Sequence, residues 1–201
     1  MFAFIKGSLE VKTTGYIVIE TNGVGYKIFM SESAIEKLGE IGSIVKVHTY
    51  VRVREDDISI YGFNTNEELR MFELLLSVSG IGAKSAITIL SNISPSSFAL
   101  AVITNDVNAL KKLPGVGPKS AQRVILELKD KIKTEEAISK ENTTVEIKEA
   151  IIEDDKVQEA VSALQVLGYS KKEIEVAMEK LDTSSLSVED IIRQGLNNLA
   201  R

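Results

Sequence analysis

The sequence predicts a multidomain α+β protein in which a small β-barrel is followed by two helical domains. Short runs rich in β-branched and aromatic residues, separated by turns, fill residues 1–63. From Asn64 onward the apolar residues recur at helical spacing instead. An acidic stretch without aromatic residues, 134–155, then divides the helical part in two. We therefore expect folded domains at 1–63, 64–133 and 156–201, with a flexible acidic linker over 134–155.

The first domain is expected to contain five strands and one short helix. Ser33 and Glu36 have the spacing of a capping box, which predicts a helix that ends near Leu38. A helix between the third and fourth of five short strands is typical of a closed barrel of the OB type, whereas an SH3-like barrel would lack it. The expected strands are Phe4–Val11, Tyr16–Glu20, Tyr26–Met30, 44–54 and Ile58–Phe63.

The second domain is expected to contain four or five short helices. Leu69, Phe72 and Leu76 share one face at helical spacing. Ser94 followed by Pro95 is typical of a helix N-cap with proline at the first helical position.

The last domain is expected to be a three-helix, UBA-like bundle. Ser170 with Glu173 and Ser187 with Asp190 have capping-box spacing, which places the starts of its second and third helices. About 45 residues is near the lower size limit for independent stability, so we interpret this part as a docking module.

The composition excludes several kinds of site. The 201 residues contain no cysteine and a single histidine, His48, so disulfides, thiol nucleophiles and cysteine-ligated zinc are ruled out and a histidine-based metal site is disfavoured. No signal peptide and no apolar run of about 18 residues is recognisable. We expect a cytoplasmic protein without metal or cofactor and without catalytic activity of its own.

Charge is distributed unevenly along the chain. The net charge is −5, but residues 64–133 contain nine basic and six acidic side chains and are therefore net positive. A basic segment within an acidic protein indicates where a polyanion could bind.

A nine-residue motif occurs twice in this basic segment. It reads Val78-Ser-Gly-Ile-Gly-Ala-Lys-Ser-Ala86 and, 35 residues later, Leu113-Pro-Gly-Val-Gly-Pro-Lys-Ser-Ala121. Glycines at this spacing permit positive φ and leave no side chain between the backbone and a ligand. Amide groups at the N-terminus of the following helix can then point at an anion. Because no group here can read a base edge, we expect sequence-independent contact with a phosphate backbone.

Other interpretations of the motif fit less well. A P-loop requires glycine directly before Lys-Ser, where Ala83 and Pro118 stand, and the dinucleotide-binding fingerprint lacks its third glycine. A pair of glycine-rich turns without a ligand is the purely structural alternative.

The repeated motif is the helix-hairpin-helix DNA-binding motif, and the chain as a whole resembles the RuvA family. Members of that family are DNA-binding subunits of the bacterial Holliday-junction branch-migration complex, which acts in recombination, repair and the SOS response. Besides both hairpins, the resemblance rests on 22–26 (Asn-Gly-Val-Gly-Tyr), 53–56 and 61–63 in the barrel, and on 164–169 (Leu-x-x-Leu-Gly-Tyr) near the C-terminus.

The resemblance implies an assembly and a set of partners. Family members form a four-fold symmetric homotetramer that holds four-way junction DNA open, as one tetramer or as two face to face. They recruit a RuvB-like hexameric ATPase, and a RuvC-like resolvase is a further possible partner.

The resemblance also assigns residues. Glu55 and Asp56 match the family's acidic pin, whose carboxylates would repel phosphates near the strand crossover. At Pro118 some relatives have an additional lysine, so one phosphate contact is absent here. The DNA-binding positions would be Gly80, Gly82, Lys84, Gly115, Gly117, Lys119 and Arg123. The motor-contacting surface would include Leu164, Leu167, Tyr169 and Leu196, of which we expect about half to face the partner.

Two alternative functions are open at this point. A helix-hairpin-helix DNA glycosylase or lyase would need a catalytic Lys or Asp in and after the hairpin, and no Asp follows Lys119 before Asp130. A general DNA-tethering module would lack preference for four-way junctions.

Overall fold

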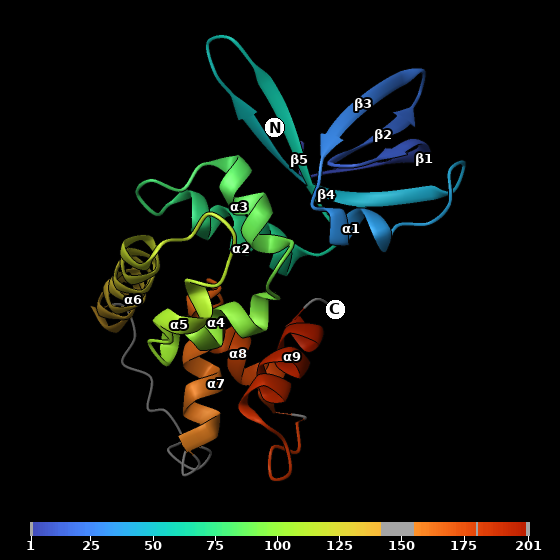
Figure 1. Cartoon of the computed structure of the whole chain (residues 1–201). Helices are drawn as coiled ribbons and strands as arrows, with labels where there is room; N and C mark the ends of the chain where they lie inside the picture. Colours follow the sequence, from blue (N-terminus) through green and yellow to red (C-terminus); the bar gives the residue numbers. More distant parts are fainter. Residues whose placement is uncertain (1, 142–154, 180, 200–201) are drawn as a thin grey trace.

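The computed structural model of the chain describes residues 2–141, 155–179 and 181–199 (Figure 1). It begins with a closed barrel of five strands in the order β1-β2-β3-β5-β4. All neighbouring strands pair antiparallel except β3 and β5, which pair parallel. This is the predicted OB-type barrel. The strands are β1 Phe4–Thr13, β2 Tyr16–Thr21, β3 Val24–Phe29, β4 Ile44–Val53 and β5 Ile58–Phe63.

The barrel helix α1, Glu32–Glu36, lies between β3 and β4 as predicted, but its cap is different. The N-cap residue is Ser31, whose Oγ accepts a hydrogen bond from the Ala34 amide at 3.2 Å. The prediction that Ser33 and Glu36 form a capping box is therefore wrong. Ser33 instead lies within the first turn, with its Oγ 3.3 Å from that of Ser31.

The central part contains five helices within residues 64–141, in agreement with the helical spacing. Ser94 caps α4 by accepting a hydrogen bond from the Ser97 amide at 3.1 Å, and Pro95 occupies the first turn, as predicted. Among the described residues no single helix is long and apolar enough to cross a membrane, although α3 and α4, bent by 101°, meet the length and composition requirement as a pair. The helices are α2 Asn66–Leu76, α3 Ala83–Leu90, α4 Pro95–Ile103, α5 Val107–Leu110 and α6 Pro118–Glu141.

Helix α6 is longer than the sequence suggested. It continues to Glu141, eight residues past position 133, where we expected the domain to end and the acidic linker to begin. The expected linker over 134–155 therefore differs from the structure in its first part, and 142–154 lie outside the described residues. Acidic composition alone did not reveal this extension, because glutamate is a good helix former.

The described residues of the C-terminal module form three helices, as predicted: α7 Asp155–Val166, α8 Lys171–Met178 and α9 Val188–Leu199. Ser170 and Glu173 form a complete capping box at α8. Ser187 caps α9, with its Oγ accepting from the Asp190 amide at 3.1 Å.

The C-terminal module packs directly on the central domain rather than standing apart. Helix α7 lies against α4, and α9 also contacts α4 (Figure 1). One continuous apolar core runs from Phe72 at the barrel side to Ile192 in the module. A second, smaller core fills the barrel around fully buried Leu9 and Ile19.

Candidate nucleic-acid interface

The two copies of the motif fold into equivalent hairpins. The first hairpin (77–82) joins α2 to α3, and the second (111–117) joins α5 to α6. In each, a backbone hydrogen bond closes the turn at the same position: Ile81 N to Val78 O at 3.1 Å and Val116 N to Leu113 O at 3.0 Å.

The glycines of each hairpin serve two different needs. Gly80 and Gly115 have φ of +88° and +78°, values that disfavour any residue with a Cβ. Gly82 has an ordinary extended backbone, with φ −97°, and Gly117 is not among the residues with positive φ. Apart from the glycine and its two chain neighbours, a Cβ added at Gly82 or Gly117 would meet no atom of the described chain within 4 Å. Positive φ therefore explains the first glycine of each pair, and the second leaves an open approach to the backbone.

The helix N-termini behind these open positions present unpaired amide groups. Gly82 is the N-cap of α3 and provides no side-chain hydrogen bond to its first amides. The first intrahelical bonds are Ala86 N to Gly82 O and, in the second hairpin, Ala121 N to Gly117 O. The preceding N–H groups of each helix are thus available to an anion. The second site has one donor fewer, because Pro118 at the first position of α6 has no N–H.

A lysine side chain accompanies each set of amides. Lys84 and Lys119 occupy the second position of α3 and α6, and both are exposed. Within the described residues, neither ammonium group has a hydrogen-bond or ion-pair partner. Each is therefore free to contact a second oxygen of a bound phosphate.

The guanidinium of Arg123 is partly occupied by a hydrogen bond within the chain. Its side chain is 55% exposed, and its Nη1 donates to the backbone carbonyl of Ser79 in the first hairpin at 3.2 Å. Because a guanidinium has five N–H donors, the remaining ones can still reach a phosphate.

The expected acidic pin lies at the tip of the β4–β5 hairpin, which extends beyond the barrel (Figure 1). Val53 and Ile58, which pair across this hairpin, are 69% and 70% exposed. Arg54 N donates to Asp57 O at 2.8 Å and closes the turn. Glu55 and Asp56 are exposed there, with no hydrogen-bond or ion-pair partner among the described residues.

The four residues expected to contact a motor are all buried. We expected about half of them to face a partner, and in this structure none of the four is exposed. Their exposed fractions are 0% for Leu164, 0% for Leu167, 6% for Tyr169 and 7% for Leu196.

Tyr169 is buried against the central domain. Its hydroxyl donates to Glu67 at 3.2 Å, and the guanidinium of Arg70 lies 4.0 Å from its ring centre. Arg70 Nη1 also donates to Gly168 O at 2.8 Å. Burial and the neighbouring Glu67 carboxylate together raise the pKa of Tyr169, so the hydroxyl stays protonated and continues to donate.

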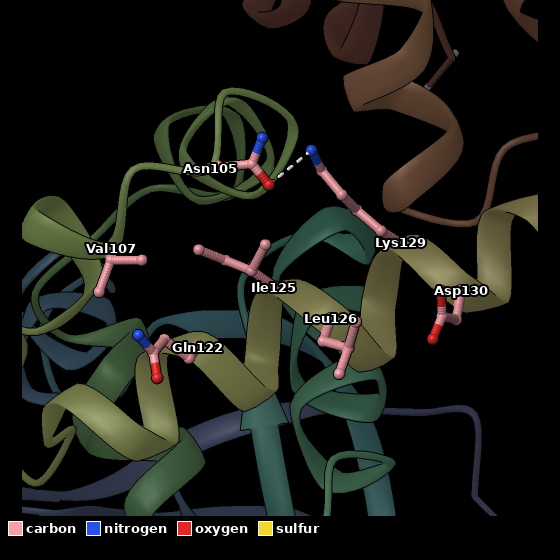
Figure 2. A pocket seen from close by; sticks show the side chains of 7 residues that line it. All are labelled: Asn105, Val107, Gln122, Ile125, Leu126, Lys129 and Asp130. Carbon is pink, nitrogen blue, oxygen red and sulfur yellow. Dashed lines mark hydrogen bonds between the residues drawn. The ribbon is translucent and has the colours of Figure 1, made fainter.

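A pocket of about 390 Å³ lies elsewhere on α6, beside the turn between α4 and α5 (Figure 2). Lys129 crosses it to donate to Asn105 Oδ1 at 2.9 Å and to Ile103 O at 2.7 Å. These bonds attach α6 to the α4–α5 turn. The described residues include no group of three or more His, Cys, Asp or Glu side chains that could hold a metal ion.

Three family profiles match the chain in the order of its domains. The RuvA N terminal domain matches residues 1–62, the SAM-like helix-hairpin-helix tandem matches 72–130, and the RuvA C-terminal domain matches 155–200.

Curated relatives match over the whole length. Each of the following is called Holliday junction branch migration complex subunit RuvA. The protein from Acetivibrio thermocellus is 53% identical over 201 residues, with all of both chains covered. That from Ruminiclostridium cellulolyticum is 45% identical over 199 residues, covering 99% of this chain and all of the relative. That from Clostridium perfringens is 41% identical over 202 residues, again with full coverage of both.

Proposed function

Because this chain belongs to the RuvA family, we propose that it is the DNA-binding subunit of a Holliday-junction branch-migration complex. The observation that supports this most is the pair of open glycine positions, Gly82 and Gly117, each in front of unpaired helix amides and beside an exposed lysine. Nothing in the family matches favours the glycosylase alternative.

In this proposal each hairpin binds one stretch of sugar-phosphate backbone. The helix amides and the positive end of the helix dipole bind phosphate oxygens, and the lysine adds a mobile charge. None of these groups distinguishes one base from another, so binding is independent of sequence. The second hairpin binds more weakly than the first because of Pro118. The proposed contacts are Gly80, Gly82, Lys84, Gly115, Gly117, Lys119 and Arg123.

We further propose that four copies assemble around the junction, with Glu55 and Asp56 near the crossover. Exposed carboxylates without cationic partners among the described residues repel phosphate. Four copies of the β4–β5 tip at one symmetry axis would concentrate eight negative charges. That repulsion would hold the four arms apart and disfavour re-pairing of the wrong strands.

Replacing both pin residues tests this function. We expect the Glu55→Gln, Asp56→Asn double variant to bind four-way junction and linear duplex with more nearly equal affinity than the unmodified chain, because the repulsion that favours an open crossover is gone. Competitive gel-shift titration of the two DNAs measures this. A variant whose junction preference equals that of the unmodified chain would contradict the pin, and an unmodified chain with no junction preference would contradict the function.

ATP hydrolysis belongs, in our proposal, to a RuvB-like hexameric partner that the C-terminal module recruits; a RuvC-like resolvase is a possible second partner. The assigned contact residues, Leu164, Leu167, Tyr169 and Leu196, are buried, so contact with a partner requires a rearrangement, which for Tyr169 means release from Glu67 and Arg70 on α2. As further parts of the proposal we retain the division into domains at 1–63, 64–133 and 156–201, with the second domain extended by α6 to Glu141, and a cytoplasmic location.

Weakening the packing of the module should strengthen motor binding. Arg70→Ala removes the bond to Gly168 and the contact with the Tyr169 ring. If it destabilises the packed state by about 1 kcal/mol, the accessible fraction, and with it the apparent affinity for the ATPase, rises about fivefold. Titration of the full chain with the ATPase, in the absence of DNA, measures this. Lys37→Ala, which removes an exposed charge from the barrel, is the control, and an Arg70→Ala chain that binds no better than it would contradict the idea.

A further inference from the structure

The DNA-binding domain contains a carboxylate beside its first hairpin. Glu127 lies on α6, and its Oε2 accepts a hydrogen bond from the backbone N–H of Ser79 at 3.0 Å. Ser79 directly precedes Gly80, the hairpin residue with positive φ. The two partners are 48 residues apart in the sequence, so this is a tertiary contact.

The backbone carbonyl of Ser79 is also bound by a side chain of α6. Arg123 Nη1 donates to Ser79 O at 3.2 Å, and Arg123 Nε lies 4.0 Å from Glu127 Oε1. Arg123 and Glu127 are one turn apart on α6. Two side chains that also pair with each other therefore bind both the N–H and the C=O of one hairpin residue.

These bonds connect the two proposed phosphate-binding sites. The first turn of α6 forms the second site, with Lys119, and a later turn provides Glu127. A helix is rigid over the distance of about 12 Å between Lys119 and Glu127. Fixing Ser79 to α6 thus fixes the first hairpin relative to the second, and binding sites held in the bound geometry lose less entropy when they engage a ligand.

We propose that Glu127 is a positioning residue that, with Arg123, holds the first hairpin in register with the second. This inference rests on the proposed function, because it takes the DNA backbone to be the ligand of both hairpins. Glu127 itself contacts no phosphate.

Charge alone predicts the opposite effect of removing Glu127. Its side chain is 29% exposed, so its negative charge repels a phosphate that approaches the first hairpin. If repulsion were its sole effect, every neutral replacement would strengthen DNA binding. If positioning dominates, the outcome depends on whether the replacement still accepts a hydrogen bond.

Two neutral replacements separate these cases. Glu127→Gln removes the charge but keeps an oxygen that can accept the Ser79 N–H, and we expect it to bind a four-way junction at least as tightly as the unmodified chain. Glu127→Ala removes the acceptor, and we expect about three- to tenfold weaker binding, which corresponds to the loss of one hydrogen bond. Because no phosphate contact is lost, the slope of log affinity against log salt should stay the same in both variants.

Glu73→Ala is the charge control: Glu73 is exposed on α2, and its carboxylate has no partner among the described residues.

A measurement without DNA distinguishes this inference from the proposed function. Hydrogen exchange at the Ser79 amide should be faster in Glu127→Ala than in the unmodified chain or in Glu127→Gln, while exchange in the barrel is unchanged. Equal affinity of the Ala and Gln variants, or equal exchange of their Ser79 amides, would overturn the positioning role. Absence of junction binding by the unmodified chain would contradict the proposed function but leave the exchange result interpretable.

Discussion

The double variant Lys84→Ala, Lys119→Ala should bind four-way junctions much more weakly and with a much smaller dependence on salt. Both ammonium groups are exposed and lie beside unpaired helix amides. Each lysine that contacts a phosphate contributes about 0.9 to the slope of log affinity against log salt. Four subunits would thus lose eight contacts, and a protein with about that number changes its affinity by about 10³–10⁵ between 50 and 200 mM salt. Gel-shift or fluorescence titration at several salt concentrations measures both quantities.

Removal of positive charge from other surfaces is the necessary control. Lys37→Ala, Lys172→Ala changes the net charge equally, but both residues are exposed on the barrel and on the C-terminal module. We expect this variant to keep a slope close to that of the unmodified chain. Equal slopes for the hairpin variant and the unmodified chain would refute the assignment of Lys84 and Lys119 to phosphates.

Substituting the second glycine of each hairpin should abolish most DNA binding while the protein stays folded. In Gly82→Ala, Gly117→Ala the added Cβ atoms meet no atom within 4 Å beyond their own residue and its two chain neighbours, and neither position needs positive φ. We expect a loss of stability no larger than about 1 kcal/mol per site, since alanine is a poorer N-cap than glycine. Each Cβ would stand where a phosphate must approach the amides, so at least a tenfold loss of affinity per hairpin, about 1.4 kcal/mol, is expected.

The first glycine of each hairpin provides the comparison. Gly80→Ala, Gly115→Ala forces residues with a Cβ into left-handed backbone, at φ of +88° and +78°. This costs about 1–2 kcal/mol per site. We therefore expect the temperature of thermal unfolding to fall, an effect that does not depend on contact with DNA. If both pairs of variants lost stability and affinity in the same proportion, the distinction between a conformational and a ligand-facing glycine would be wrong.

Most of the architecture was predictable because it depends on local patterns. Runs rich in β-branched and aromatic residues indicated the barrel strands, helical spacing indicated that the chain after Asn64 is helical, and the capping box at Ser170 marked the start of α8 correctly. The predictions were wrong where the sequence is compatible with two different local structures. Ser31 and Ser33 can both cap α1, and the sequence does not indicate which hydroxyl reaches the Ala34 amide. The acidic residues after position 133 suit a helix as well as a linker.

Contacts between distant segments were not predictable from one sequence. The repeat identified the hairpins, but nothing local pairs Ser79 with Glu127 or Tyr169 with Glu67. For the same reason the sequence did not indicate that Tyr169 is buried between the module and α2. Only the folded arrangement shows that a carboxylate supports the first hairpin.

The most direct test is a crystal structure of the full chain bound to a four-way junction. We expect phosphate oxygens within about 3.2 Å of backbone amides at the N-termini of both α3 and α6, with no contact from either hairpin to a base edge. The account would be contradicted if the DNA lay on a different surface, with Gly82 and Gly117 facing solvent or another protein chain.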